Sequence, residues 1–276
     1  MNAPAMSRIV VALDPAGRGD FAVEMAAFVS GDDALEIVGL FVEDTRLIEH
    51  ARSPVAREVA FSGHERSLDP QSLERQIRAQ ASEARRRFET AAAKLGLRHA
   101  FQIARGEVLA EVSREAADAE LLVVSFGVET RLRGGWGAPV EQLVRARLPA
   151  LLFARESAPS GGVLVVLETS VQAVAALTTA VRLAKRGRAP LMVLATTAVL
   201  GDPDVDAVLV AEGSAAPTLV AAERITAETI ARAARGARLV ILPSREAAAD
   251  ESLIGTLLAQ LRAPLMLVRD RTSASH

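Results

Sequence analysis

Two arginines, Arg131 and Arg133, lie in a glycine-rich loop and have the clearest potential for ligand chemistry. A guanidinium group can bind one phosphate through two parallel hydrogen bonds. The alternative is that both side chains are simply solvated. Trp136, the single tryptophan, belongs to the same loop and covers a ligand, packs at a subunit contact or closes the local core. The glycines of this loop are Gly127, Gly134, Gly135 and Gly137.

Other common catalytic groups are absent or unsuitably spaced. The chain has no cysteine, which excludes disulfides, thiolate nucleophiles and thiolate metal ligands. Its four histidines show no metal-ligand spacing. No Ser-His-Asp arrangement can be argued, because the serines and histidines fall in unlike segments. We therefore expect no catalytic residues and no metal site.

Composition narrows the class of protein further. The formal net charge is −2 and half of the 276 residues are hydrophobic, so we expect a sizeable core and neither a nucleic-acid nor a membrane partner. The run Arg85–Arg87 is best explained as the solvated face of a helix. The N-terminus lacks the long apolar segment of a signal peptide, and no apolar run approaches the length of a membrane helix. The expectation is a soluble, cytoplasmic protein.

Alternating strand and helix patterns must position the glycine-rich loop. Short, almost wholly apolar runs such as residues 8–14 are typical of strands buried on both faces. Residues 71–96 have apolar side chains at helical spacing and predict a long helix. The resulting β-α order predicts a parallel sheet with helices on both faces. Five strands are expected in this half, at residues 8–14, 34–42, 98–104, 119–125 and 149–154.

The second half of the sequence repeats this pattern. Residues 162–168 match 8–14, and a proline precedes the last apolar run of each half, at Pro149 and Pro264. We interpret the chain as a tandem duplication of five-stranded α/β units, with domains at 7–155 and 162–270. The last strand of each unit is expected to meet the other across an approximate twofold axis, because otherwise each would be an exposed apolar edge.

Two segments do not fit this simple pattern. Residues 43–70 lose their periodicity and are expected to form a loop or a partial helix. Residues 201–214 predict either a short helix or an extra strand. The long helix of the first half therefore has no full counterpart in the second.

The order of these elements, the Asp that ends the first strand and the glycines before the fifth resemble the universal stress protein family, over both halves. The family motif Gly-x2-Gly-x9-Gly-Ser/Thr is a phosphate site, its Asp reaches the adenine side, and a valine after the second strand lines the base pocket. The resemblance implies an adenine-nucleotide site, for ATP, in the first half. Its residues would be Leu13, Asp14, Val42, Gly127, Gly137 and Ala138.

The match to this motif is partial. Val124 stands where the first glycine belongs, Ala138 replaces the final Ser or Thr, and Pro139 removes one backbone donor. In the second half Glu168 replaces the Asp, and residues 243–253 contain no glycine. We expect a pocket in the first half, between the ends of the first and fourth strands. We expect the second-half pocket to be filled by side chains.

Three functions follow from these observations. The first is a stress-response regulator that acts through unidentified protein partners, with weak or no nucleotide binding. The second is an ATP or AMP sensor that uses the first-half pocket. The third, a nucleotide-hydrolysing enzyme, has no general base, metal cluster or intact phosphate loop in its favour, and fold alone does not imply function. Each of these functions is compatible with a homodimer of the chain.

Overall fold

The structure of this chain is a computed structural model. Among the described residues, no helix combines the length and the apolar character that crossing a membrane requires. The description covers residues 8–14, 19–31, 36–53, 57–59, 65–67, 69–126, 142–144, 148, 150–155, 161–169, 173–211, 217–244 and 251–269.

The first half alternates strands and helices as predicted. Its long helix begins at Pro70, where Asp69 accepts hydrogen bonds from the backbone N–H groups of Gln71 and Ser72 at 3.2 and 3.1 Å. A side-chain cap of this kind satisfies donors that the first helical turn leaves free. The elements are β1 (Arg8–Ala12), α1 (Gly19–Ser30), β2 (Glu36–Asp44), α2 (Thr45–Ala51), β3 (Arg57–Val59), β4 (Glu65–Ser67), α3 (Pro70–Lys94), β5 (Arg98–Gly106), α4 (Val108–Ala116), β6 (Leu121–Phe126) and β7 (Ala150–Arg155).

The second half follows the same order, with a short helix, α9 (Pro203–Ala211), in the place of the long α3: α9 packs against α7 as α3 packs against α1. The segment that the sequence left undecided contains a helix, Pro203–Ala211, and no strand among its described residues. The elements are β8 (Val163–Leu167), α7 (Ala173–Arg186), β9 (Leu191–Thr196), α8 (Thr197–Leu200), α9 (Pro203–Ala211), β10 (Thr218–Ala222), α10 (Ala227–Ala233), β11 (Leu239–Pro243), α12 (Glu251–Gln260) and β12 (Leu265–Val268).

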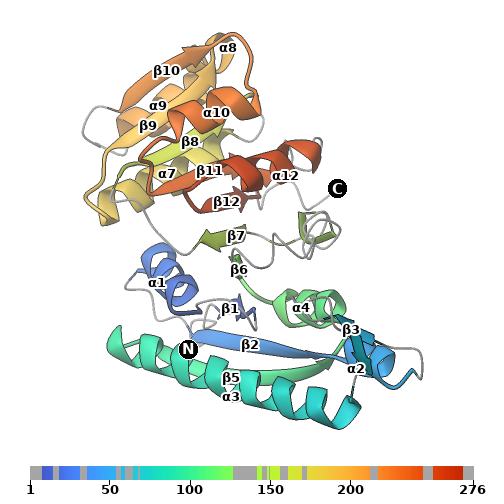
Figure 1. Ribbon diagram of the computed structural model, residues 1–276. Coiled ribbons are helices and arrows are strands. Elements are labelled where there is room, and N and C mark those ends of the chain that lie inside the picture. The colour runs from blue at the N-terminus through green and yellow to red at the C-terminus, as the bar shows by residue number, and fades with distance from the viewer. Residues whose placement is uncertain are drawn as a thin grey trace.

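Ten strands form one continuous sheet, in the order β10-β9-β8-β11-β12-β7-β6-β1-β2-β5. Within each half the five strands are parallel and have the same spatial order. The halves join where β7 and β12 pair antiparallel, with Phe153 opposite Leu265 and Ala150 opposite Val268 (Figure 1). This pairing confirms that the last strands of the two units meet. The domain boundaries at 7–155 and 162–270 remain a prediction.

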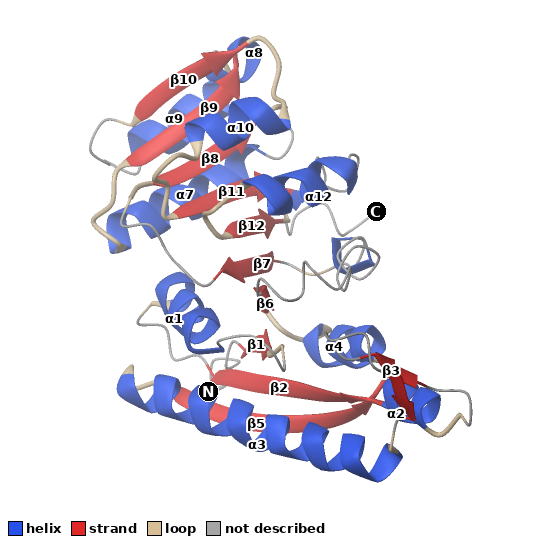
Figure 2. Cartoon of the chain, viewed as in Figure 1, coloured by secondary structure: helices blue, strands red, loops and turns tan. Residues whose placement is uncertain are grey.

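Helices cover both faces of the sheet (Figure 2). Successive residues of β1 alternate between two core layers. Ile9 and Val11 belong to the layer that includes side chains of α1, α3 and α7, whereas Val10 and Ala12 belong to the layer that includes side chains of α4, α10 and α12. Side chains on neighbouring strand positions point to opposite faces, so a strand covered on both sides must be apolar throughout. This explains the uninterrupted apolar runs in the sequence.

The segment at 43–70 is more ordered than the sequence suggested. The strand β2 continues to Asp44, whose carboxylate accepts a hydrogen bond from the Arg46 backbone N–H at 2.9 Å and caps α2. Two short strands, β3 and β4, then pair antiparallel as a separate sheet. Among the described residues of this segment, the prediction of a loop or partial helix was right for α2 and wrong for β3 and β4.

Besides the strand pairing, α1 and α7 link the two halves. The Arg186 guanidinium donates a hydrogen bond from Nη1 to the Val29 carbonyl at 2.8 Å, close to the end of α1. The Arg238 guanidinium lies 4.1 Å from the centre of the Phe28 ring. The chain leaves α1 through Gly31 at a φ of 64°, and a Cβ there would lie 2.0 Å from the Arg186 Cζ. Gly31 thus provides both the turn and the room for the arginine.

Gly31→Ala is expected to lower the free energy of unfolding by about 2–3 kcal/mol, because the left-handed backbone costs about 1–2 kcal/mol and displacing Arg186 costs about 1 kcal/mol more. Gly96→Ala is the matched control, since Gly96 has a φ of 67° and a Cβ added there would have no atom within 4 Å. Urea denaturation of the two variants separates the backbone cost from the cost of displacing the arginine. Equal losses of stability in the two variants would show that displacing Arg186 from its place beside Gly31 costs no free energy of unfolding.

Candidate functional site

A cavity of about 200 Å³ lies where β1 and β2 end in the first half. Most of its wall is apolar, and Leu40, Phe41 and Val112 are each no more than 2% exposed. Polar atoms come from Asp14, Asp44 and Gln80. An apolar wall with a few polar groups is typical of small-molecule sites. The lining residues are Ala12, Leu13, Asp14, Leu40, Phe41, Val42, Asp44, Leu47, Ile77, Gln80, Val108 and Val112.

Strand pairing brings the two key segments together. Ala12 of β1 lies opposite Leu40 of β2, and the Leu13 backbone N–H then donates to the Leu40 carbonyl at 2.9 Å. This bond keeps the chain beyond β1 beside β2, so that Asp14 and Val42 line the same cavity. The predicted residues Leu13, Asp14 and Val42 are therefore brought together.

A second cavity, of about 290 Å³, adjoins the first. The two share Leu13, Asp14 and Gln80. The second is the more polar, and its wall includes Arg87, whose Nε lies 2.6 Å from the Glu83 carboxylate. Asp14 thus stands between an apolar compartment and a polar one, which suits a ligand with a ring at one end and polar groups at the other.

The remaining predicted residues lie outside the described part of the chain. These are Gly127, Gly137 and Ala138, together with Arg131, Arg133 and Trp136. Val124, which stands at the first motif glycine position, is fully buried in β6 and packs in the core opposite Ala12. The described cavity lies between the ends of β1 and β2. The pocket expected between the ends of β1 and β6 stays a prediction, because the residues that follow Phe126 lie outside the described part of the chain.

Sequence reasoning missed the helical part of this wall. Leu47 comes from α2, Ile77 and Gln80 from α3, and Val108 and Val112 from α4. A partial signal existed, because Ile77 belongs to the apolar face of the predicted long helix and Gln80 follows it by one helical turn. Nothing in the sequence indicated that this face reaches past the end of β1.

The second half differs at the corresponding place. In β8 and β9, Val166 lies opposite Leu194 as Ala12 lies opposite Leu40, so Thr196 occupies the position of Val42. The Thr196 hydroxyl donates to the Glu168 carbonyl at 3.1 Å. The helix α8 begins immediately afterwards, at Thr197, whereas β2 continues for two more residues before α2. The two strand ends are thus tied directly together, which is consistent with a lost second-half site.

The described residues offer no alternative centre of metal chemistry. Within them, no group of three or more His, Asp or Glu side chains is placed to hold a metal ion. The described walls of the first-half cavity are suited to binding a ligand. They offer apolar surface, a carboxylate at Asp14 and a carboxamide at Gln80.

Comparison with solved structures identifies the fold. The chain is similar to a universal stress protein from Archaeoglobus fulgidus DSM 4304, with a TM-score of 0.64, 13% identity, and coverage of 95% of this chain and 96% of that one. It is also similar to a functionally unknown protein from Pseudomonas aeruginosa PAO1, with a TM-score of 0.58, 15% identity, and coverage of 97% and 94%. No protein-family model and no curated protein matches the sequence. These likenesses confirm the predicted fold over nearly the whole chain.

Proposed function

We propose that this chain is a tandem universal stress protein, a stress-response regulator whose first half binds an adenine nucleotide and whose second half has lost that site. The observation that carries the proposal is that Leu13, Asp14 and Val42 line one cavity, although Val42 is far from the other two in sequence. The fold shared with a universal stress protein supports the same class. Binding, and not turnover, is the proposed activity.

The size of the cavity indicates how a nucleotide would sit. A volume of about 200 Å³ is below the roughly 300–1,000 Å³ of sites that enclose a whole drug-sized ligand. The base alone would occupy this apolar compartment, with the Asp14 carboxylate accepting from an amino or hydroxyl group. The sugar and phosphates would lie outside it, on the side of the more polar cavity that contains Arg87.

The test is calorimetric titration with ATP up to millimolar concentration. The first-half cavity of the wild-type chain should bind one ATP, and Asp14→Asn should weaken that binding about ten- to a hundredfold, because a hydrogen bond to a charged group is worth about 1.5–3 kcal/mol. Glu168→Gln is the matched control: it makes the same change at the equivalent position of the second half and should leave affinity unchanged. Val42→Phe should also reduce binding, by filling the cavity.

Two outcomes would contradict the proposal. One is the absence of saturable heat together with an unchanged melting temperature at millimolar ATP. The other is an equal loss in Asp14→Asn and Glu168→Gln, since the second-half position has no role in the proposed site. The first result would favour the alternative, a regulator of this fold that works through protein partners without a nucleotide. The second would place ATP binding outside the first-half cavity.

A further inference from the structure

A larger cavity, of about 770 Å³, lies in the second half at the amino ends of β11 and β12. It is bounded by the C-terminal ends of α10 and α12, which pack against each other. Because β12 runs antiparallel to β7, this cavity faces the same edge of the sheet as the first-half cavity, with β7 and β6 between them. The lining residues are Glu228, Ala231, Arg232, Ala234, Arg235, Gly236, Gln260, Leu261, Arg262 and Ala263.

Three arginines line this cavity without a partner among the described residues. Arg232, Arg235 and Arg262 are all exposed, and the side chain of none of them makes a hydrogen bond or ion pair with another described residue. The dipole of α10 favours a cation in its last turn, which accounts for Arg232. Arg235 and Arg262 lie two residues beyond the ends of α10 and α12, where the dipoles also favour a cation. Three like charges therefore surround one hollow without a carboxylate bound to any of them.

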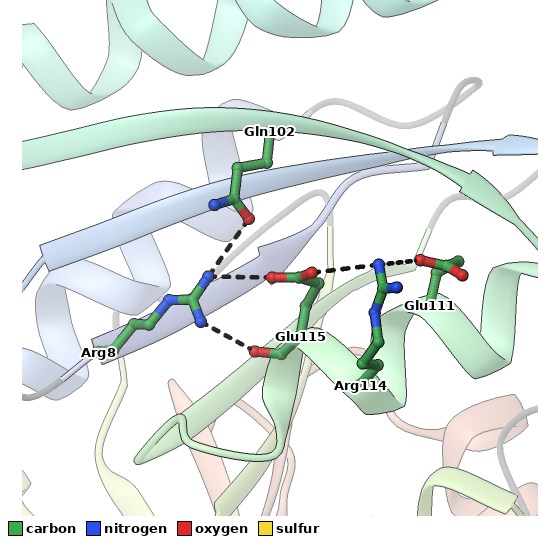
Figure 3. A network of polar contacts seen from close by, with 5 residues as sticks. All are labelled: Arg8, Gln102, Glu111, Arg114 and Glu115. Carbon is green, nitrogen blue, oxygen red and sulfur yellow. Dashed lines mark hydrogen bonds and ion pairs between the residues drawn. The ribbon is translucent and has the colours of Figure 1, made fainter.

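In the first half, the arginine at the equivalent place has its charge neutralised by two glutamates. Arg114 has the same position relative to β6 as Arg232 has to β11, and Arg114 is paired with Glu111 and Glu115 (Figure 3). Glu115 also bridges to Arg8 at 3.2 Å, and Arg8 bonds to Gln102, which joins α4 to β1 and β5. Arg232 therefore lacks the carboxylate partners that its first-half equivalent has, so the fold itself does not require this arginine to be unpaired.

The rest of the wall suits a small organic anion. Its floor is apolar, with Ala234, Leu261 and Ala263 each no more than 6% exposed. Its volume falls within the range of small-molecule sites. Gly236, at a φ of 79°, leaves part of the wall without a side chain. Glu228 would repel a nearby phosphate but can accept a hydrogen bond from a hydroxyl or amino group elsewhere on the ligand.

We propose that this arginine-lined cavity binds a small molecule that carries two or more phosphate groups. Arginine binds phosphate through paired hydrogen bonds in a planar geometry that lysine does not offer, and three guanidinium groups match several phosphate oxygens. A nucleic acid is less well matched, because the lining residues include no aromatic side chain on which a base could stack. This site is independent of the adenine-nucleotide site proposed above.

The experiment is a calorimetric titration of the full chain with inorganic pyrophosphate at low ionic strength. We expect one saturable site, and Arg232→Gln and Arg262→Gln should each weaken binding about tenfold or more. Added salt should weaken binding further. Arg224→Gln is the matched control, because Arg224 is exposed in the same half but follows the carboxyl end of β10, at the opposite edge of the sheet. It should leave the affinity unchanged.

Several results would overturn the proposal. They are the absence of saturable binding at millimolar pyrophosphate, an equal loss in Arg224→Gln, and a loss caused by Asp14→Asn, which would move the pyrophosphate to the first-half cavity. Binding of a single-stranded oligonucleotide without binding of pyrophosphate would also overturn it, since that pattern indicates a general basic surface. Melting temperatures equal to that of the wild type will show that the glutamine variants are folded.

Discussion

Replacing Phe88 by alanine is expected to lower the free energy of unfolding by about 3–5 kcal/mol. Phe88 lies on α3, is fully buried, and is the contact through which this helix fits the sheet. It packs where Gly39 of β2 has no side chain: a Cβ at Gly39 would lie 2.8 Å from the Phe88 ring. The Phe101 ring centre is 5.9 Å from that of Phe88. Truncation would therefore leave a cavity that no neighbour can fill without moving the helix.

The measurement is equilibrium urea denaturation. Leu95→Ala is the matched control, because Leu95 follows the same helix but is 43% exposed, and its truncation should change stability by no more than about 0.5 kcal/mol. Gly39→Ala alone should cost about 1–3 kcal/mol by overpacking, and much less when combined with Phe88→Ala. A loss below about 1 kcal/mol in Phe88→Ala would show that Phe88 does not anchor α3. Because α3 also carries Ile77 and Gln80, ATP binding should weaken along with stability.

Leu152→Asp is expected to remove at least about 4 kcal/mol of stability, and to do so in both halves at once. Leu152 is fully buried on β7 and lies opposite Met266 on β12, in the antiparallel pair that joins the halves. The substitution removes a large apolar side chain and places a carboxylate in a core layer shared by α1 and α7. The parts of the sheet on both sides of the β7–β12 pair should therefore lose their packing at the same time.

Circular dichroism during thermal unfolding and gel filtration will test this expectation. The matched control is Leu219→Asp, which makes the same change on β10, where Leu219 is 51% exposed. It should change stability by no more than about 0.5 kcal/mol. A single, strongly lowered transition in Leu152→Asp would support one cooperative sheet. Retention of the wild-type transition, or loss of one half only, would contradict it.

Much of the architecture was predictable because the environment of each buried strand constrains its sequence. A strand such as β8, with Val163–Leu167 covered on both faces, has to be apolar throughout, and its match to residues 9–13 revealed the second unit. The apolar runs that follow Pro149 and Pro264 identified β7 and β12, the two strands whose antiparallel pairing joins the halves. These signals are local and depend on periodicity, so one sequence suffices to detect them.

The candidate site was only partly predictable, because its shape depends on where the strands end and the next helices begin, and not only on the types of residues. Asp14 and Val42 were expected at the ends of the first two strands, and they line one cavity. That β2 continues to Asp44 while β9 gives way to α8 after Thr196 could not be deduced from composition, since the apolar run of each strand ends before the strand itself does, at Val42 and at Ala195. The arginine-lined cavity of the second half brings together helix ends whose proximity only the topology determines.

The antiparallel pairing of β7 with β12 also determines how the assembly responds to dilution. When two separate chains pair, the fraction that is paired falls with concentration. Here the partner is tethered, and short flexible tethers give effective concentrations in the millimolar range. In a symmetric dimer every substitution occurs twice, at both copies of the interface. In this chain each half can change alone, so Thr196 can bond to Glu168 in one half while Val42 and Asp14 line a cavity in the other.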